Sequence, residues 1–466
     1  MKNLSLFFRA TLLLILLTGT ALTSAAYDFV SGGIYYNITS STNMTVAVTY
    51  YSKTNNTYSG TVSIPEKVTY DGKTYYVTAI GESAFVGCTG LKGVNFTSDK
   101  TTSIGNYAFQ GCNGMTSFVI PPQITSIGNG VFNGCYGMTG LTIEESEETL
   151  SLGYSSSNGT NVGLFCNVPL TSVFIGRPLS YSTTSYGYSP FANNKTLVKA
   201  HFGNPVKYFP NYLFYGCTSL STMVYNSQFK PTSVGSHCFH GCTSLTWSAL
   251  NLPQTVKTIG ESAFDGCTKF TSVVIKPNIT SISNHAFDNC SEMTGLTIEE
   301  SEETLSLGYT SSNGTNIGLF RNRPLTSVFI GRPLSYSTTS YGYSPFANNK
   351  TLVKARLGKK LSSIPNYLFY GCTYLDEVTS CATTPPTANS NCFANYEARL
   401  YVPINSVNSY SQANVWKNFA YITGVDVGDD DEPIVPGWVI GDVDGDGLVN
   451  IYDVTALIDY LLYGHF

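Results

Sequence analysis

The residues best spaced for chemistry lie near the C-terminal end, where carboxylates alternate with small residues in GDVDGDGLVNIYDV. Five side-chain oxygen donors fall at positions 1, 3, 5, 9 and 12 of a twelve-residue loop, and position 7 adds a carbonyl: Asp442, Asp444, Asp446, Asn450, Asp453 and Leu448. Calcium prefers six to eight such oxygens, with glycine at position 6, where Gly447 stands. The loop therefore predicts one bound Ca²⁺, and the alternative is a solvated acidic turn.

Two other groups have the residue types of a reactive site. The segment SHCFHGC holds His237, Cys238, His240 and Cys242, but Cys242 occupies a position that recurs along the chain, so we do not expect a metal there. The acidic runs 144–148 and 299–303 are copies of each other, which favours solvated loops over acid–base carboxylates. The sequence contains no phosphate loop, nucleophile elbow or zinc-protease helix motif. We therefore predict that the protein is not an enzyme.

The elements that position these groups come from a short repeat, seen in TAIGESAFVGC (78–88) and KTIGESAFDGC (257–267). Thirteen phenylalanines mark its copies: Phe85, Phe109, Phe132, Phe165, Phe191, Phe214, Phe239, Phe264, Phe287, Phe320, Phe346, Phe369 and Phe393. Most gaps are 23 to 26 residues. Alternating segments such as 271–275 predict short strands that pair in parallel, and each Ala-Phe segment predicts one helical turn. We expect one solenoid over 77–393, with stacked phenylalanines in a continuous core.

A longer duplication overlies the repeat, because residues 140–200 return 155 positions later as 295–355. Each copy carries a polar excursion, GYSSSNGTN or GYTSSNGTN, followed by LSYSTTSYGYSPF. Tyrosine among Ser, Thr and Gly is typical of recognition surfaces, and aromatic faces also suit sugars. The candidate ligand surface consists of Tyr181, Tyr186, Tyr188, Tyr336, Tyr341 and Tyr343. The alternative is that these rings pack their own loops.

Eight of the twelve cysteines share one position, three residues after the phenylalanine: Cys88, Cys112, Cys135, Cys217, Cys242, Cys267, Cys290 and Cys372. A disulfide ladder is one interpretation for an exported chain. Parallel copies on neighbouring turns hold their Cβ atoms farther apart than a disulfide prefers, so we predict buried free thiols. A bridge between Cys381 and Cys392 stays open.

The N-terminal end predicts export. Residues 1–26 combine Lys2 and Arg9, a short apolar stretch and small residues before Tyr27, as in a signal peptide, with a membrane anchor as the alternative. No second apolar stretch is long enough for a membrane helix, so we expect a secreted or cell-surface chain. Without residues 1–26 the chain has 23 basic and 30 acidic residues, a net charge of −7. That balance argues against nucleic acid as a partner.

The Ser-Ile-Gly, Ala-Phe and Gly-Cys repeat resembles the BspA-like leucine-rich repeats of bacterial surface and secreted proteins. The flanks resemble that family's caps, a β-rich cap at 27–76 and a closing cap at 394–425 within the similar stretch 381–425. The family implies adhesion, with a host or bacterial surface protein or a glycan as the partner.

After the acidic linker 426–440, residues 441–466 resemble a single dockerin repeat, because Asp453 replaces the usual glutamate and no helix precedes the loop. Val454, Leu457, Ile458 and Leu461 follow as one apolar helix face. Dockerins carry two such repeats, and this chain shows one, which leaves the helix face without its usual partner. The resemblance implies a cohesin-like partner. The alternative function is therefore a component of a cellulosome-like, polysaccharide-degrading assembly.

Overall fold

The computed structural model describes residues 26–53, 56–337 and 341–427. The chain divides into two compact units: unit 1 comprises residues 1–116 and 123–137, and unit 2 comprises 117–122 and 138–466. Almost all of the predicted signal peptide, most of the linker and every predicted Ca²⁺ ligand from Asp442 to Asp453 lie outside the described residues. In the described part of the chain, no helix has the length and apolarity needed to cross a membrane.

Unit 1 begins with antiparallel strands and continues with parallel ones. Its strands are β1 (Phe29–Ser31), β2 (Ile34–Ser40), β3 (Thr45–Thr49), β4 (Gly60–Ile64), β5 (Lys67–Tyr70), β6 (Lys73–Ile80), β7 (Leu91–Phe96), β8 (Ser103–Ile104) and β10 (Ser126–Ile127). The hairpin β1–β2 turns through Gly32 and Gly33, whose φ values of 57° and 79° suit a two-residue turn. From the pairing of β3 with β6 onward, the ladder through β8 to β10 is parallel.

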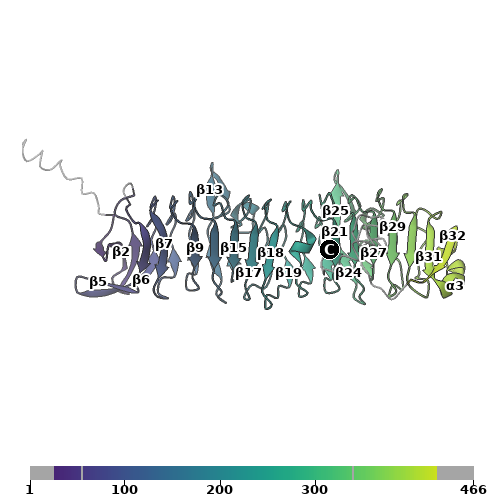
Figure 1. The fold of residues 1–466 in the computed structure, drawn as a ribbon, viewed down its shortest axis with the longest axis horizontal. Coiled ribbons are helices and arrows are strands. Elements are labelled where there is room, and N and C mark those ends of the chain that lie inside the picture. Colours follow the sequence, from purple (N-terminus) through teal and green to yellow (C-terminus); the bar gives the residue numbers. More distant parts are fainter. Residues whose placement is uncertain (1–25, 54–55, 338–340, 428–466) are drawn as a thin grey trace, which may run out of the picture. The chain divides into compact units, whose positions relative to one another are not determined.

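Unit 2 holds the remaining strands, most of them in parallel ladders (Figure 1). One sheet has the order β18 (Thr222–Tyr225), β17 (Lys199–Phe202), β15 (Ser172–Ile175), β11 (Gly140–Ile143) and β9 (Ser117–Ile120). Another has the order β21 (Ser272–Ile275), β23 (Gly295–Ile298), β27 (Ser327–Ile330), β29 (Lys354–Leu357), β30 (Glu377–Ser380), β31 (Arg399–Pro403) and β32 (Tyr421–Val425).

In its described residues, unit 2 also contains shorter strands and six short helical segments. Two-residue and three-residue strands form further parallel pairings: β12 (Leu150–Leu152) with β16 (Leu179–Ser180), and β19 (Ser233–Val234), β20 (Thr258–Ile259), β22 (Ser281–Ile282), β24 (Leu305–Leu307) and β28 (Leu334–Ser335). The helices are η1 (Tyr186–Tyr188), α2 (Trp247–Leu250), η2 (Tyr341–Tyr343), η3 (Ile404–Ser406), α3 (Val407–Gln412) and η4 (Trp416–Asn418). The predicted parallel-strand solenoid is confirmed.

The two polar excursions form antiparallel hairpins, β13 (Ser155–Ser157) with β14 (Thr160–Val162), and β25 (Tyr309–Ser312) with β26 (Thr315–Gly318). Figure 1 shows both hairpins projecting from the same edge of unit 2. Asn158 and Asn313 take positive φ values of 50°, which lets each chain reverse within two residues. The duplication therefore places one loop twice on one side of the same unit.

The phenylalanine ladder is the core of each unit, as predicted. In unit 1 the Phe85 and Phe109 rings stack with centroids 5.2 Å apart, and Phe109 lies 5.9 Å from Phe132. In unit 2 the rings from Phe165 to Phe393 follow one another at 5.3 to 5.9 Å. Such offset ring pairs contribute beyond their buried area, and the ladder repeats that gain at each turn.

The Ala-Phe segments form tight turns in which successive backbone amides alternate between two acceptors, one within the turn and one on the next turn. In the first copy the Cys88 amide donates to the Phe85 carbonyl within the turn, at 3.1 Å, whereas the Phe85 amide donates to Ala108 on the next turn, at 2.8 Å. Ser83 and Gly87, two residues before and after Phe85, have φ values of 57° and 71°. These left-handed residues interrupt the single helical turn expected from the sequence, and so every second amide bonds to the neighbouring repeat.

The eight repeat cysteines are free and buried, as predicted. Seven of these thiols donate to the phenylalanine carbonyl of the preceding turn, at 3.0 to 3.3 Å: Cys112, Cys135, Cys217, Cys242, Cys267, Cys290 and Cys372. Cys381 and Cys392 are also free thiols. The recurrent cysteine therefore acts as a small side chain that donates a hydrogen bond between turns.

Where the thiol is absent, another donor can reach the same acceptor. Asn194 and Asn349 occupy the cysteine position, and their Nδ2 atoms donate to Phe165 and Phe320 at 2.7 and 3.1 Å. Arg323 also occupies it and donates from Nη1 to Phe287 at 3.2 Å. Most copies therefore place a hydrogen-bond donor at this position, although Val168 after Phe165 is an exception, and the sequence pattern alone did not indicate this role.

Alkylation should distinguish these thiols from disulfides. Under denaturing, non-reducing conditions, intact-mass measurement should show at least the eight repeat cysteines labelled. In the native protein labelling should be slow, because burial raises the pKa of Cys88 and Cys372 to about 11 and of Cys135 and Cys290 to about 12, and the thiolate is the reactive form. Pairs of repeat cysteines that resist labelling after denaturation would contradict the geometric argument.

Candidate ligand-binding groove

One turn of unit 2 departs from the strand pattern and interrupts the parallel sheets. After Leu245 the chain forms α2, a single helical turn closed by the Leu250 amide on Thr246 and the Asn251 amide on Trp247, at 3.0 and 3.1 Å. Asn251 has a φ of 36°, so the chain leaves the helix through a left-handed residue. As a result, β18 is the last strand of one sheet and β21 the first strand of the next, and α2 contacts both.

The interruption leaves a groove of about 750 Å³ between α2 and β21. Its walls combine an indole and aliphatic side chains with hydroxyl, amide and charged groups: Thr246, Trp247, Ser248, Asn251, Leu252, Pro253, Lys269, Thr271, Ser272, Val274, Lys276, Asn278, Ile279 and Glu292. Ligand sites are hollows of this size, largely apolar and with a few converging polar groups. The groove thus has the composition of a binding site.

Trp247 connects the groove to the core. Its ring meets Phe264 and Phe270 edge-on, with centroids 5.6 and 5.3 Å away, and lies 6.0 Å from Phe287. The side chain nevertheless stays partly exposed. An indole held on three sides by buried rings loses little further freedom when a ligand contacts it, which favours binding.

The charged groups of the groove have hydrogen-bonding partners beside them. Lys269 Nζ lies 3.3 Å from Glu292 Oε1, and both side chains are about half exposed. Lys276 Nζ donates to the Leu252 carbonyl at 3.2 Å. The lining contains no histidine or cysteine, so the described residues of the groove supply hydrogen bonds and aromatic contact rather than an evident nucleophile and base.

The structure places four of the six predicted tyrosines in internal contacts. Tyr181 and Tyr336 donate their hydroxyls to the carbonyls of Asn211 and Asn366 at 2.8 and 2.9 Å, and burial raises the pKa of Tyr181. The Tyr188 and Tyr343 hydroxyls accept hydrogen bonds from asparagines of the adjacent hairpins, at 2.8 and 3.2 Å. These four rings support the loops that carry them.

Tyr186 is the predicted tyrosine with the most accessible described ring, at 47% exposure. It stacks on Tyr215 at 4.6 Å, which in turn stacks on His240 at 4.4 Å. The side chain of Tyr341, its copy, lies outside the described residues. The tyrosine surface predicted from the sequence thus contains one ring placed to meet a ligand.

The His–Cys segment does not converge on one point. The rings of His237 and His240 stack on Tyr212 and Tyr215 and are partly exposed, whereas the Cys238 and Cys242 thiols are fully buried. Across the described part of the chain, no three His, Cys, Asp or Glu side chains come together as a metal site.

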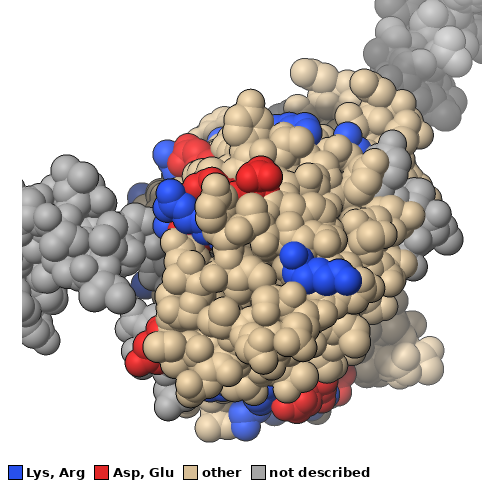
Figure 2. Space-filling model, turned by 90° about the vertical axis from the view of Figure 1, so that its right-hand side faces the viewer, with Lys and Arg blue, Asp and Glu red and all other residues tan. Residues whose placement is uncertain are grey.

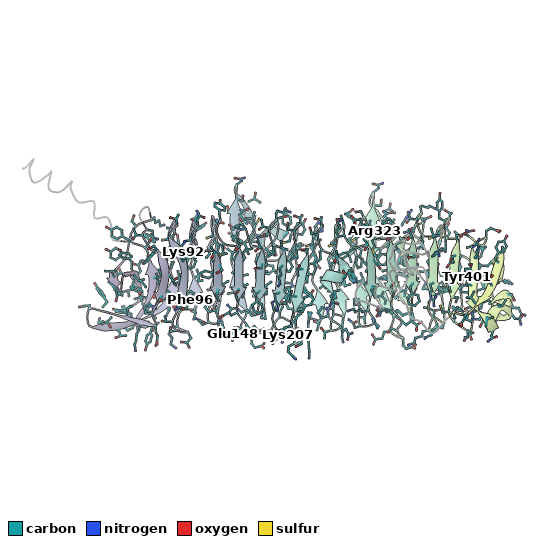
Figure 3. All side chains as sticks on the ribbon, in the orientation of Figure 1. Lys92, Phe96, Glu148, Lys207, Arg323 and Tyr401 are labelled. Carbon is teal, nitrogen blue, oxygen red and sulfur yellow. The ribbon has the colours of Figure 1, made fainter. Side chains whose placement is uncertain are left out.

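The acidic runs mostly face solvent, but each contains one structural carboxylate. Glu145 accepts the Asn204 amide at 3.1 Å, and Glu300 accepts the Lys359 amide at 2.9 Å. Figure 3 shows Glu148 and Lys207 on one edge of unit 2, and Arg323 toward the opposite edge. The face in Figure 2 likewise carries few charged side chains, scattered and of both signs.

Sequence reasoning missed Trp247 and the groove. The available signal was the stretch LTWSALNLP, in which Trp247 and Leu250 stand three residues apart where every neighbouring copy alternates in steps of two. A local change from strand period to helix period indicates an interrupted sheet.

Comparison with known proteins gives a family for the repeats. The model of the BspA type leucine-rich repeat region (6 copies) matches residues 55–162, 158–247, 232–317 and 317–423. No curated protein matches the chain. Solved structures that resemble it include a leucine-rich repeat protein from Bacteroides ovatus, 20% identical, covering 86% of this chain and 100% of that one, TM-score 0.46.

Two further structures are similar at lower identity. A leucine-rich cell surface protein from Faecalibacterium prausnitzii is 16% identical, covering 85% of this chain and 94% of its own, TM-score 0.32. The pneumococcal vaccine antigen PcpA is 13% identical, covering 87% and 100%, TM-score 0.33.

Proposed function

Because this chain belongs to the BspA-type leucine-rich repeat family, we propose that it is an exported binding protein that recognises a surface protein or glycan through unit 2. Three observations support the proposal: the predicted signal peptide at 1–26, the family, and the groove between α2 and β21. The groove is the main support for the proposal, because a partly exposed indole and a hollow of ligand size occur together where a helix replaces the strand between β18 and β21.

The lining fits a glycan chain or an extended peptide. A sugar would place its C–H face on Trp247 and its hydroxyls on Asn251, Asn278 and the Lys269–Glu292 pair. A peptide would use the free edge of β21 for backbone hydrogen bonds. Binding of either ligand would contribute to adhesion. An array of glycans and host proteins would show which of the two classes the protein binds.

Filling the groove should abolish this binding. Ser272, the first residue of β21, lines the groove, and Ser117 is the first residue of β9 at the same register opposite a glycine. Ser272→Trp should weaken binding of an array hit at least tenfold, while Ser117→Trp should leave it unchanged, as measured by surface plasmon resonance. Equal binding by both variants would show that the ligand contacts another surface.

We propose further that the C-terminal loop binds one Ca²⁺ through Asp442, Asp444, Asp446, Leu448, Asn450 and Asp453. This rests on the donor types and their spacing, because four carboxylates gathered in one loop repel one another until a cation neutralises them. Calcium should order the helix that begins at Asp453. The dockerin-like sequence supports the second candidate function, attachment through a cohesin-like partner to a polysaccharide-degrading assembly.

Calorimetry should detect this site. The mature protein should bind one Ca²⁺, and the double variant Asp442→Ala, Asp446→Ala should lose that binding, because two of the four carboxylate ligands are then gone. Equal binding by the variant would place the ion elsewhere in the chain. No binding by either protein would leave a solvated acidic turn.

A further inference from the structure

One edge of β21 faces the groove with its backbone groups. On the other edge, amides at either end of the β23 segment donate to the carbonyls of Thr271 and Ile275, at 3.1 and 3.0 Å. Peptide groups point to alternate sides along a strand. The N–H and C=O groups of Ser272 and Val274, which lie between these two residues, therefore point away from β23 and toward α2.

The turn that precedes β21 does not pair with these groups. On a regular turn, the amide that opens a strand donates to the turn before it, as the first amide of β18 does at 3.0 Å. In α2 the equivalent carbonyl, that of Thr246, accepts the Leu250 amide at 3.0 Å, and the Leu250 carbonyl accepts a tyrosine hydroxyl of β18 at 2.6 Å. Across the described residues, no backbone hydrogen bond joins α2 to Ser272 or Val274.

The spacing of these groups matches an extended peptide better than a sugar. Ser272 and Val274 stand two residues apart, so their donors and acceptors repeat at about 6.6 Å, which is the repeat of a second β-strand. An unpaired strand edge is a template for another chain, and pockets beside it select alternate side chains. Here the pocket is the groove itself, with Trp247 and Ile279 among its apolar walls.

The charges of the groove add a preference for an acidic group. Lys269 has Glu292 beside it at 3.3 Å, whereas Lys276 donates to the Leu252 carbonyl and forms no ion pair with a described carboxylate. Lys276 directly follows β21 and lines the groove together with Ser272. An acidic side chain on the bound segment is therefore complementary to Lys276.

We propose that the groove binds an extended peptide segment of a partner protein, which adds to β21 as a further strand. The segment exchanges backbone hydrogen bonds with Ser272 and Val274, places alternate side chains against Trp247, and sets an acidic side chain beside Lys276. This assignment rests on the proposed function and narrows its ligand from a surface protein or glycan to a strand-forming segment.

Peptides selected on the mature protein test the strand pairing. A phage-displayed library of random twelve-residue peptides supplies the probes, and surface plasmon resonance measures the synthetic peptides. N-methylation of one alternate set of peptide amides should weaken binding at least tenfold, because those amides donate to the carbonyls of Ser272 and Val274. Methylation of the intervening amides should change binding less than about twofold. Sensitivity without this alternation would overturn strand addition.

Substitutions in the protein identify the same edge. Val274→Pro removes the amide donor, and the fold should tolerate it because proline is accepted where an edge N–H lies outside the ladder. It should weaken the selected peptides at least tenfold, while Val274→Thr, which keeps the amide, should bind within about twofold of wild type. Thermal unfolding followed by circular dichroism checks that both variants fold. Equal binding by folded Val274→Pro and Val274→Thr would overturn the edge assignment.

The acidic contact has its own variant. Lys276→Gln should weaken the selected peptides about threefold at low salt and less at high salt, because it removes one opposite charge. An unchanged affinity would overturn the placement of an acidic side chain beside Lys276.

The groove variants separate failure of this assignment from failure of the proposed function. Glycan-array binding that Ser272→Trp abolishes and Ser117→Trp preserves, with no peptide selected, would overturn strand addition and leave the groove as the binding site. Peptides that bind Ser272→Trp as well as wild type would overturn the groove as their site. A dimer of the protein alone that Val274→Pro dissociates, seen by size-exclusion chromatography, would assign the edge to a second copy instead.

Discussion

Raising the pH from 9 to 10 should lower the free energy of unfolding of unit 2 by about 6 kcal/mol, close to the whole stability of an ordinary domain. Seven thiols of this unit are fully buried, and burial raises the pKa most strongly in six of them: Cys217, Cys238, Cys242, Cys267, Cys290 and Cys372. Burial raises the pKa of each above the ordinary value of 9.0, because the thiolate cannot be solvated in the core.

The sign follows from which state holds the proton. Below pH 9 the thiols are neutral in the folded and the unfolded chain, so their contribution is fully present. Above pH 9 the unfolded chain loses protons that the folded chain keeps. Each thiol then lowers the free energy of unfolding by roughly 1 kcal/mol per pH unit, until the pH reaches the pKa of that thiol in the folded chain. For Cys372 and Cys290 that pKa is about 11 and about 12.

Urea unfolding at half-unit steps from pH 7.5 to 10.5, with a reductant present, measures this dependence. The variant Cys267→Ala, Cys290→Ala should be less stable at pH 7.5 but should show a shallower decline above pH 9, since two titrating groups are gone. A wild-type stability that stays flat to pH 10 would contradict the burial of neutral thiols.

Replacing Phe264 by alanine should cost about 4 kcal/mol, the second large effect, because the ring is fully buried in the ladder. It lies between Phe239 and Phe287, with centroids 5.7 and 5.6 Å away, and also supports Phe270 and Trp247. A stacked turn contacts only its neighbours, so the missing ring leaves a cavity that distant turns cannot close. Loss of support under Trp247 should weaken ligand binding in the groove as well.

Urea unfolding compares this variant with two controls. Phe264→Leu keeps most of the volume and should cost about 1 kcal/mol. Tyr421→Ala removes an aromatic side chain that is 60% exposed and should change stability by less than about 0.5 kcal/mol. A Phe264→Ala cost as small as that of Tyr421→Ala would mean that the ladder rings are not a rigid core.

The repeated pattern was enough to predict the parallel ladder, the stacked phenylalanines and the buried thiols. Each turn packs against a copy of itself, so the residue that meets Phe264 is known from the spacing to be Phe239 or Phe287. The repeat spacing therefore identifies contacts between residues that lie far apart in the sequence. The alternating turns around each phenylalanine were missed, because φ at residues such as Ser83 is set by hydrogen bonds to the next turn.

Only the tertiary structure showed where the repeat pattern is interrupted and what replaces it. The donor role of Asn194, Asn349 and Arg323 depends on which carbonyl lies within reach of the cysteine position. The groove exists because α2 fills one turn and leaves an edge of β21 unpaired.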